Sequence, residues 1–109
     1  MLLLLSLTAG CQSINQQSAE NGKATLIIKT IGNTTTEDFD RVGMTALQML
    51  QEKHKTKSSF GFAVRCVDDV CAEGGYWWPM YVNGELSSVG SQSYIVKNND
   101  KIEFVLSKK

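Results

Sequence analysis

The segment GGYWWPMYVNG, residues 74–84, gathers the side chains best suited to hold a ligand. It contains both tryptophans of the chain, Trp77 and Trp78, and two of its three tyrosines, Tyr76 and Tyr81. Aromatic rings bury large apolar areas, and tyrosine and tryptophan add a polar atom at one end. These rings therefore belong either to the core of the domain or to a surface that binds something.

Two cysteines lie close together in CVDDVC. If the two central aspartates form a two-residue hairpin turn, Cys66 faces Cys71 in a non-hydrogen-bonded pair. The Cβ atoms of such a pair lie within reach of a disulfide. We predict a structural disulfide that holds the register of this hairpin. A metal or redox site is the alternative, but the spacing is not Cys-x-x-Cys and the one histidine, His54, is distant in sequence.

The other polar residues do not form a recognisable catalytic set. His54 follows Leu47 and Leu50 on one face of a predicted helix, near its C-terminal end, where a cation is favourable. We therefore expect a partly exposed histidine at the helix end rather than a ligand or a general base. Asp68 and Asp69 are too few for a calcium site. The sequence also has no serine–histidine–carboxylate spacing, so we expect a protein that is not an enzyme and has no metal or cofactor.

The chain opens with MLLLLSLTAGC, an apolar run that is too short to span a bilayer. We interpret residues 1–11 as an export signal. Its Gly-Cys ending resembles a prokaryotic lipoprotein signal, in which Cys11 is lipidated; the alternative is a secretory signal with an incidental cysteine. Residues 12–23 are polar and weakly charged, which is typical of a flexible tether. We therefore expect an extracytoplasmic, lipid-anchored protein in a compartment where disulfides persist.

The remaining residues, 24–109, are expected to form one domain, because the whole chain has only 109 residues. The whole chain has eleven basic and eleven acidic residues, so its charges balance, and it contains no strongly basic segment. Nucleic acid is therefore not an expected partner.

The elements that must position the aromatic and cysteine residues follow from hydrophobic patterning. Residues 24–32 are typical of a strand, and residues 33–42 of a turn and a short edge strand. A helix is predicted within residues 43–55, because Thr45 and Gln48 fit a capping box.

Strands dominate the rest of the chain. They are predicted over residues 60–67, 76–82, 85–96 and 101–107, with Asn83-Gly84 as a hairpin turn. Pro79 lacks a backbone N–H, so its strand is expected at a sheet edge or beside a bulge. Strands with a single helix indicate an α+β fold, here a β-grasp-like small mixed sheet with one packed helix.

Four pieces of the sequence, in this order, resemble the small domain at the C-terminus of transcobalamin and intrinsic factor, which also occurs in prokaryotic surface proteins. They are the helix start GMTALQML, the hairpin WPMYVNG, Gly90, and YIVKNNDKIEFVL. The resemblance covers residues 24–106 and implies a β-grasp fold. In the vitamin carriers this domain closes over one face of cobalamin, whereas the helical domain that holds the other face has no counterpart in this sequence.

The resemblance also divides the aromatic residues between two faces. By this match, Trp78, Met80 and Val82 belong to the core. Alternation along a strand then places Trp77 and Tyr81 on the opposite face, as an aromatic platform, and the first residue of the strand could reach the rim of either face. The candidate ligand-binding residues are therefore Tyr76, Trp77 and Tyr81.

Two binding functions are compatible with these features, and a third possibility is a purely structural surface protein. The first is a membrane-tethered, non-catalytic module that binds a small ligand, such as a corrinoid or a sugar, through the aromatic surface. The second is a protein–protein module that docks onto a larger envelope partner by an edge strand. The expected partner is thus a small ligand or an envelope protein, and cobalamin is the ligand that the resemblance suggests.

Overall fold

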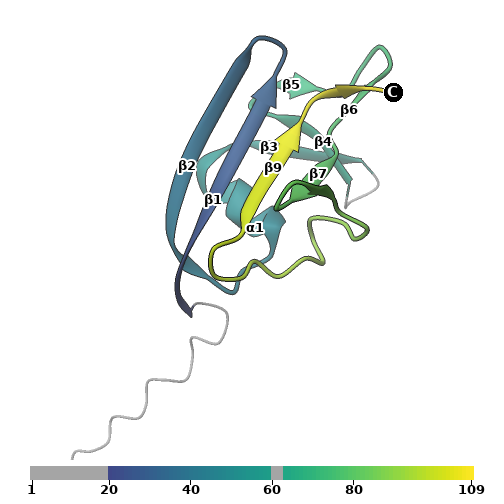
Figure 1. Ribbon diagram of the computed structural model, residues 1–109. Coiled ribbons are helices and arrows are strands. Elements are labelled where there is room, and N and C mark those ends of the chain that lie inside the picture. The colour runs from purple at the N-terminus through teal and green to yellow at the C-terminus, as the bar shows by residue number, and fades with distance from the viewer. Residues whose placement is uncertain (1–19, 60–62) are drawn as a thin grey trace, which may run out of the picture.

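The computed structural model describes residues 20–59 and 63–109, and a mixed five-stranded sheet dominates it (Figure 1). The strand order is β2-β1-β9-β7-β8, with β1 and β9 parallel and the other pairs antiparallel. The strands are β1 (Glu20–Thr30), β2 (Asn33–Val42), β7 (Met80–Val82), β8 (Glu85–Leu86) and β9 (Lys101–Val105). The first and last long strands of the chain therefore meet at the centre of the sheet.

The helix α1 (Ala46–Lys53) packs on one face of this sheet (Figure 1). It begins with the predicted capping box: the Gln48 backbone N–H donates to the Thr45 hydroxyl, and the Thr45 backbone N–H donates to the Gln48 side chain. Each bond satisfies a backbone donor that has no partner within the helix. The inward face of the helix is apolar, with Ala46, Met49 and Leu50 buried.

Two smaller sheets complete the domain. Strands β3 (Thr56–Ser59), β4 (Ala63–Val67) and β5 (Val70–Cys71) form an antiparallel three-stranded sheet. Strands β6 (Tyr76–Trp77) and β10 (Ser107–Lys108) pair with each other. The three-stranded sheet contributes Val67 to the same hydrophobic core as the five-stranded sheet and α1, so these layers enclose one core.

The core residues follow the periodicity of the strands and the helix. Leu26 on β1 and Ile102 and Phe104 on β9 are fully buried, as are Met49 and Leu50 on α1. Their neighbours along each strand are at least partly exposed, because successive side chains point to opposite faces. The predicted α+β class, with one helix on a mixed sheet, is confirmed.

Two N-terminal boundaries differ from the prediction. β1 begins at Glu20, so residues 20–23, predicted as tether, belong to the domain. β2 has ten residues instead of forming a turn and a short strand. Its threonines favour strands because they are β-branched, and it pairs with β1 along its whole length. Few of its residues are apolar because most of the strand is exposed, which hid it from hydrophobic patterning.

Residues 76–82 do not form the single strand that was predicted. β6 pairs with β10, β7 pairs with β9 and β8, and the chain leaves both pairings at Trp78 and Pro79. The break coincides with the missing N–H of Pro79, which cannot donate to a ladder. β7 is not an edge strand, because the edges of the five-stranded sheet are β2 and β8.

The strand predicted over residues 85–96 is wrong beyond β8, after which the chain forms a loop. β3 was not predicted, because Thr56–Ser59 contains no apolar residue. Phe60 and Phe62, predicted on a strand, lie outside the described residues, as do Cys11 and the predicted export signal. Within the described ranges, no helix is long and apolar enough to cross a membrane.

Candidate functional site

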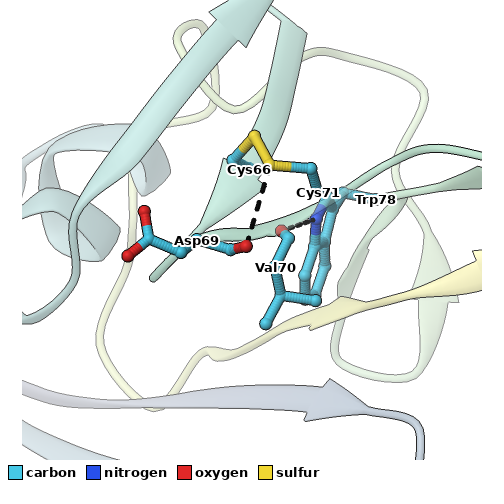
Figure 2. Close-up of a disulfide and its surroundings, with 5 residues drawn as sticks. All are labelled: Cys66, Asp69, Val70, Cys71 and Trp78. Atoms are coloured by element: carbon cyan, nitrogen blue, oxygen red, sulfur yellow. Dashed lines mark hydrogen bonds between the residues drawn. A yellow bond between two sulfur atoms is a disulfide. The ribbon is translucent and has the colours of Figure 1, made fainter.

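The two neighbouring tryptophans have opposite environments. Trp78 is only 6% exposed, and its indole Nε1–H donates to the backbone carbonyl of Val70 at 3.1 Å. Figure 2 shows this bond next to the disulfide that joins Cys66 and Cys71. Trp78 therefore connects the β4–β5 hairpin to the core, and its predicted place in the core is confirmed, as is that of Met80, which is also 6% exposed.

Trp77 is 40% exposed, and Tyr76 beside it is half-buried. Both belong to β6, where Trp77 lies opposite Ser107. The turn before β6 contains Gly74 and Gly75, both with positive φ, a conformation that glycine adopts without steric conflict. This turn and the short pairing with β10 place β6 at one end of the domain, beside the C-terminal strand (Figure 1).

Tyr81 lies elsewhere. It follows the buried Met80 on β7 and pairs with Glu103 on β9, so its side chain is on the sheet face that α1 does not cover. The predicted platform of Trp77 and Tyr81 is therefore not a single surface. The break at residues 78 and 79 separates the strands that carry the two rings, so the alternation of one strand does not continue into the other.

A groove of about 650 Å³ lies beside Tyr76 and Trp77. Trp78, Met80 and Phe104, which are buried core residues, also line it. Most of its other lining residues come from β4, from Leu86 of β8 and from the loop that follows β8, and Ala72, Pro79 and Lys109 complete the lining. The groove is therefore built on the rigid core, with exposed rings on one side and a loop among its walls.

Two residues of this groove were missed by sequence reasoning. Leu86 and Val89 line it and are 56% and 48% exposed. The segment that carries them was predicted as a strand, in which they would have been assigned to strand packing. The sequence does contain a clue to this loop. The two aliphatic residues lie in the serine-rich run ELSSVGSQS, whose composition is unusual for a strand.

The residues that carry the transcobalamin-type pattern near the C-terminus form a polar cluster around Asp100, which is 6% exposed. One carboxylate oxygen of Asp100 accepts from the Asn83 side-chain amide at 2.9 Å. The other accepts from the Tyr94 hydroxyl at 2.6 Å and from the Lys97 backbone N–H at 2.8 Å. This cluster ties the Asn83-Gly84 hairpin to the turn before β9.

The ionisation of this cluster follows from its bonds. Burial alone would raise the pKa of Asp100, but the hydrogen bonds from Tyr94, Lys97 and Asn83 outweigh burial and lower it. Burial and the bond to the Asp100 carboxylate raise the pKa of Tyr94 to about 12. Asp100 is thus a charged acceptor with three donors, and its role is structural.

The predicted hairpin and disulfide are confirmed. Asp68 and Asp69 both have positive φ, as a two-residue type I′ turn requires, and Cys66 pairs with Cys71 in the β4–β5 register. The Cα atoms of the two cysteines are 4.0 Å apart, and their sulfurs are bonded.

Comparison with known protein families shows to which family the chain belongs. The model of the domain of unknown function DUF4430 matches residues 43–108, more than half of the chain. The chain belongs to the DUF4430 family. No curated protein sequence matches it.

Two solved structures share the fold of this DUF4430 chain. One is a Ruminococcus gnavus protein assigned as a candidate metal-binding protein, with a TM-score of 0.70, 18% identity and coverage of 82% of this chain and 99% of that one. The other is haptocorrin in complex with Cbi, with a TM-score of 0.69, 21% identity and coverage of 86% of this chain. This chain spans 26% of that haptocorrin chain. The resemblance to the vitamin-carrier domain is thus confirmed for the fold.

His54 of the DUF4430 domain lies at the C-terminal end of α1 and is partly exposed, as predicted, but its side chain makes contacts that were not predicted. Its side chain is 8% exposed and lies between two carboxylates: Nε2 is 2.7 Å from Glu37 of β2, and Nδ1 contacts Asp68 of the β4–β5 turn. Burial alone would lower the pKa of His54, but the hydrogen bonds to Asp68 and Glu37 outweigh burial and raise it. His54 thus links three elements that hydrophobic patterning could not place side by side.

This cluster does not have the form of a metal site. The two carboxylates contact different ring nitrogens, which point in different directions, so a single ion cannot contact all three groups. Among residues 20–59 and 63–109, no group of three or more histidine, cysteine or acidic side chains is arranged to hold a metal ion.

Proposed function

We propose that this DUF4430 domain is a non-catalytic binding module that holds a small planar ligand in the groove beside Tyr76 and Trp77. The observation that carries this proposal is the position of the exposed apolar side chains. The described residues have five large ones, and three of them line this one groove: Trp77, Leu86 and Val89. Single exposed apolar residues are ordinary, whereas a cluster of them in a concave site is typical of ligand binding.

A corrinoid is the first ligand to test. The fold shared with haptocorrin in complex with Cbi supports this choice, as does a groove volume of about 650 Å³, because small-molecule sites commonly enclose about 300 to 1,000 Å³. The chain corresponds to only 26% of that haptocorrin chain. We therefore propose that the groove contacts one side of the ligand and leaves the other side open.

We further propose a setting for this module. Residues 1–11 act as an export signal, Cys11 carries a lipid, and the polar residues before Glu20 hold the domain outside the membrane. Within the α+β class, we assign the domain to the β-grasp type, because one helix packs on a mixed sheet whose first and last long strands are parallel neighbours.

The proposal is tested by titrating residues 20–109, which contain the whole described core, with cobalamin and cobinamide. Isothermal titration calorimetry avoids the absorption of the corrin ring. We expect saturable binding that Trp77→Ala weakens at least about tenfold, a change of about 1.4 kcal/mol. Tyr81→Ala is the matched control, because it removes an aromatic ring on β7 that does not line the groove. If both variants lose affinity equally, or if neither substitution changes the affinity, the groove is not the binding site.

A second function has one observation in its favour. β2 is a ten-residue edge strand that pairs only with β1 among the described strands, so its other side can add a strand from an envelope protein. A charge on an edge opposes such pairing, so the uncharged half of β2, residues 33–36, is the part available for it. If this function is correct, Thr36→Lys abolishes binding to the envelope partner and Trp77→Ala does not; the opposite pattern contradicts edge docking.

A further inference from the structure

We infer that the groove selects an anionic ligand: a planar ring system that carries a carboxylate, phosphate or sulfonate group. This inference rests on the proposed function and adds the charge of the ligand to it. Two charged residues line the groove, Arg65 of β4 and Lys109, and both are cationic. None of the described residues that line it is an aspartate or a glutamate.

Among the described residues, Arg65 forms no ion pair that would neutralise it. Lys109 carries an α-carboxylate beside its ammonium group, so Arg65 is the cation on which the inference depends. The ion pairs among the described residues involve Lys23, Lys29, Arg41 and His54, and none involves Arg65 or Lys109. The acidic residues adjacent in sequence to the groove walls, Glu73, Glu85 and Glu103, do not line it.

A third cation strengthens the positive potential at the aromatic side. The Lys108 ammonium nitrogen lies 5.7 Å from the centre of the Tyr76 ring. The chain as a whole has a net charge of zero, so the excess of positive charge at the groove arises from placement and not from composition. Charges of one sign in a concave site concentrate ligands of the opposite sign.

The groove also offers a hydroxyl without a protein partner. Ser91 lines it and is 6% exposed, and its hydroxyl makes no hydrogen bond to another of the described side chains or backbone groups. A buried hydroxyl without a partner is unfavourable, and a ligand oxygen would satisfy it. The Arg65 guanidinium can form two parallel hydrogen bonds with a carboxylate or a phosphate, which a neutral ring could not accept.

The test uses two dyes that share one ring system and differ in charge. 8-Anilino-1-naphthalenesulfonate is anionic, and N-phenyl-1-naphthylamine is the same framework without the sulfonate. We expect the anionic dye to bind residues 20–109 at least about tenfold more tightly than the neutral dye, and its affinity to fall with added salt, because screening weakens exposed charge interactions.

Arg65→Gln should weaken the anionic dye at least about tenfold and change the neutral dye by less than about twofold. Arg65→Lys, which keeps the charge but not the two parallel hydrogen bonds, should have an affinity between those of wild type and Arg65→Gln. The matched control is Lys101→Gln, which removes one positive charge from β9 outside the groove and should leave both dyes unchanged. Thermal unfolding of each variant verifies that the domain is folded.

The outcomes separate the two claims. If both dyes bind equally well and both are lost in Trp77→Ala, the groove binds ligands but the inferred charge selectivity is wrong. If Arg65→Gln and Lys101→Gln weaken the anionic dye equally, the effect is one of net charge and the inference is also wrong. If Trp77→Ala affects neither dye, the groove is not the binding site, and the proposed function and this inference are both overturned.

Discussion

At the scale of single residues, environment rather than residue type decides the role of each side chain. Trp77 and Trp78 are adjacent, yet one is 40% exposed in a groove and the other donates a hydrogen bond from within the core. The same holds for the polar residues. Asp100 and His54 are each held by several hydrogen bonds to other elements, and we therefore assign them to stability rather than to binding.

We predict that Asp100→Asn destabilises the domain by about 2 kcal/mol, because it removes the negative charge and replaces one acceptor oxygen by an amide N–H₂ that faces one or two of the three donors. Tyr94→Phe should have a smaller effect, about 1 kcal/mol, because it removes one of those three hydrogen bonds. Urea unfolding followed by far-ultraviolet circular dichroism measures both. A larger effect for Tyr94→Phe would contradict the central role of the carboxylate.

His54 should make stability depend on pH. Its pKa is raised from 6.5 in the folded state, so its contribution is fully present below pH 6.5 and is lost as the pH rises through the folded value. The pKa of Asp68, lowered from 3.8, has the opposite consequence: its contribution is present above pH 3.8 and is lost as the pH falls through the folded value. The interaction is therefore strongest between pH 3.8 and 6.5.

The measurement compares the unfolding free energy of wild type and His54→Gln across this range. We expect a difference of about 2 kcal/mol at pH near 6 that shrinks toward pH 9. Glu37→Gln, which removes one of the two carboxylates, should shift the transition to lower pH. A difference that is the same at all pH values would mean that the charge of His54 does not contribute.

At the scale of elements, two independent features fix the register of the β4–β5 hairpin. The type I′ turn at Asp68-Asp69 sets the register, and the disulfide between Cys66 and Cys71 covalently holds the same register. The hairpin in turn positions Arg65 at the groove and Val70 as the acceptor for Trp78. Loss of the disulfide should therefore affect stability first, and the groove only through the placement of β4.

We predict that replacing both cysteines, Cys66→Ala with Cys71→Ala, lowers the unfolding free energy by about 2 kcal/mol, as expected for a closed loop of this length. Reduction of the wild type by dithiothreitol should produce the same loss, and the double variant should not respond to it. Two free thiols in the unreduced wild-type protein, measured by thiol titration or intact mass, would show that the bond does not form.

At the scale of the whole molecule, Tyr76, Trp77 and Arg65 line one groove, and we propose that the residues before β1 connect the domain to the membrane. This arrangement suits a module that presents a ligand to, or receives one from, a partner on the open side of the groove. The proposed anchor is part of that function, because it keeps the domain at the membrane surface.

The anchor has a direct test. Cys11→Ser should move the protein from the membrane fraction to the soluble fraction of the producing cells, because the lipid attaches to that thiol. Wild type should label with a radioactive or clickable fatty acid, and the variant should not. A variant that remains in the membrane fraction after high-salt washing would show that another segment holds the protein there.

Local features were predictable from sequence to the extent that neighbouring residues determine them. The capping box at Thr45, the turns at Asp68-Asp69 and Asn83-Gly84, and the pairing of Cys66 with Cys71 were all predicted correctly. Each depends on residues within a few positions of one another, where side-chain chemistry and backbone conformation are directly linked. The α+β class followed from the order of such elements.

Contacts between distant segments were not predictable in this way. The break at Trp78 and Pro79 lets β6 pair with β10 and β7 pair with β9, and Tyr81 of β7 does not line the groove. Leu86 of β8 and Arg65 of β4, which are distant from β6 in sequence or pairing, do line it. His54 meets Glu37 and Asp68 only because the helix end, β2 and the β4–β5 turn converge. The sequence by itself determined the turns, the caps and the disulfide, whereas strand pairing and packing over long separations decided which side chains share the groove.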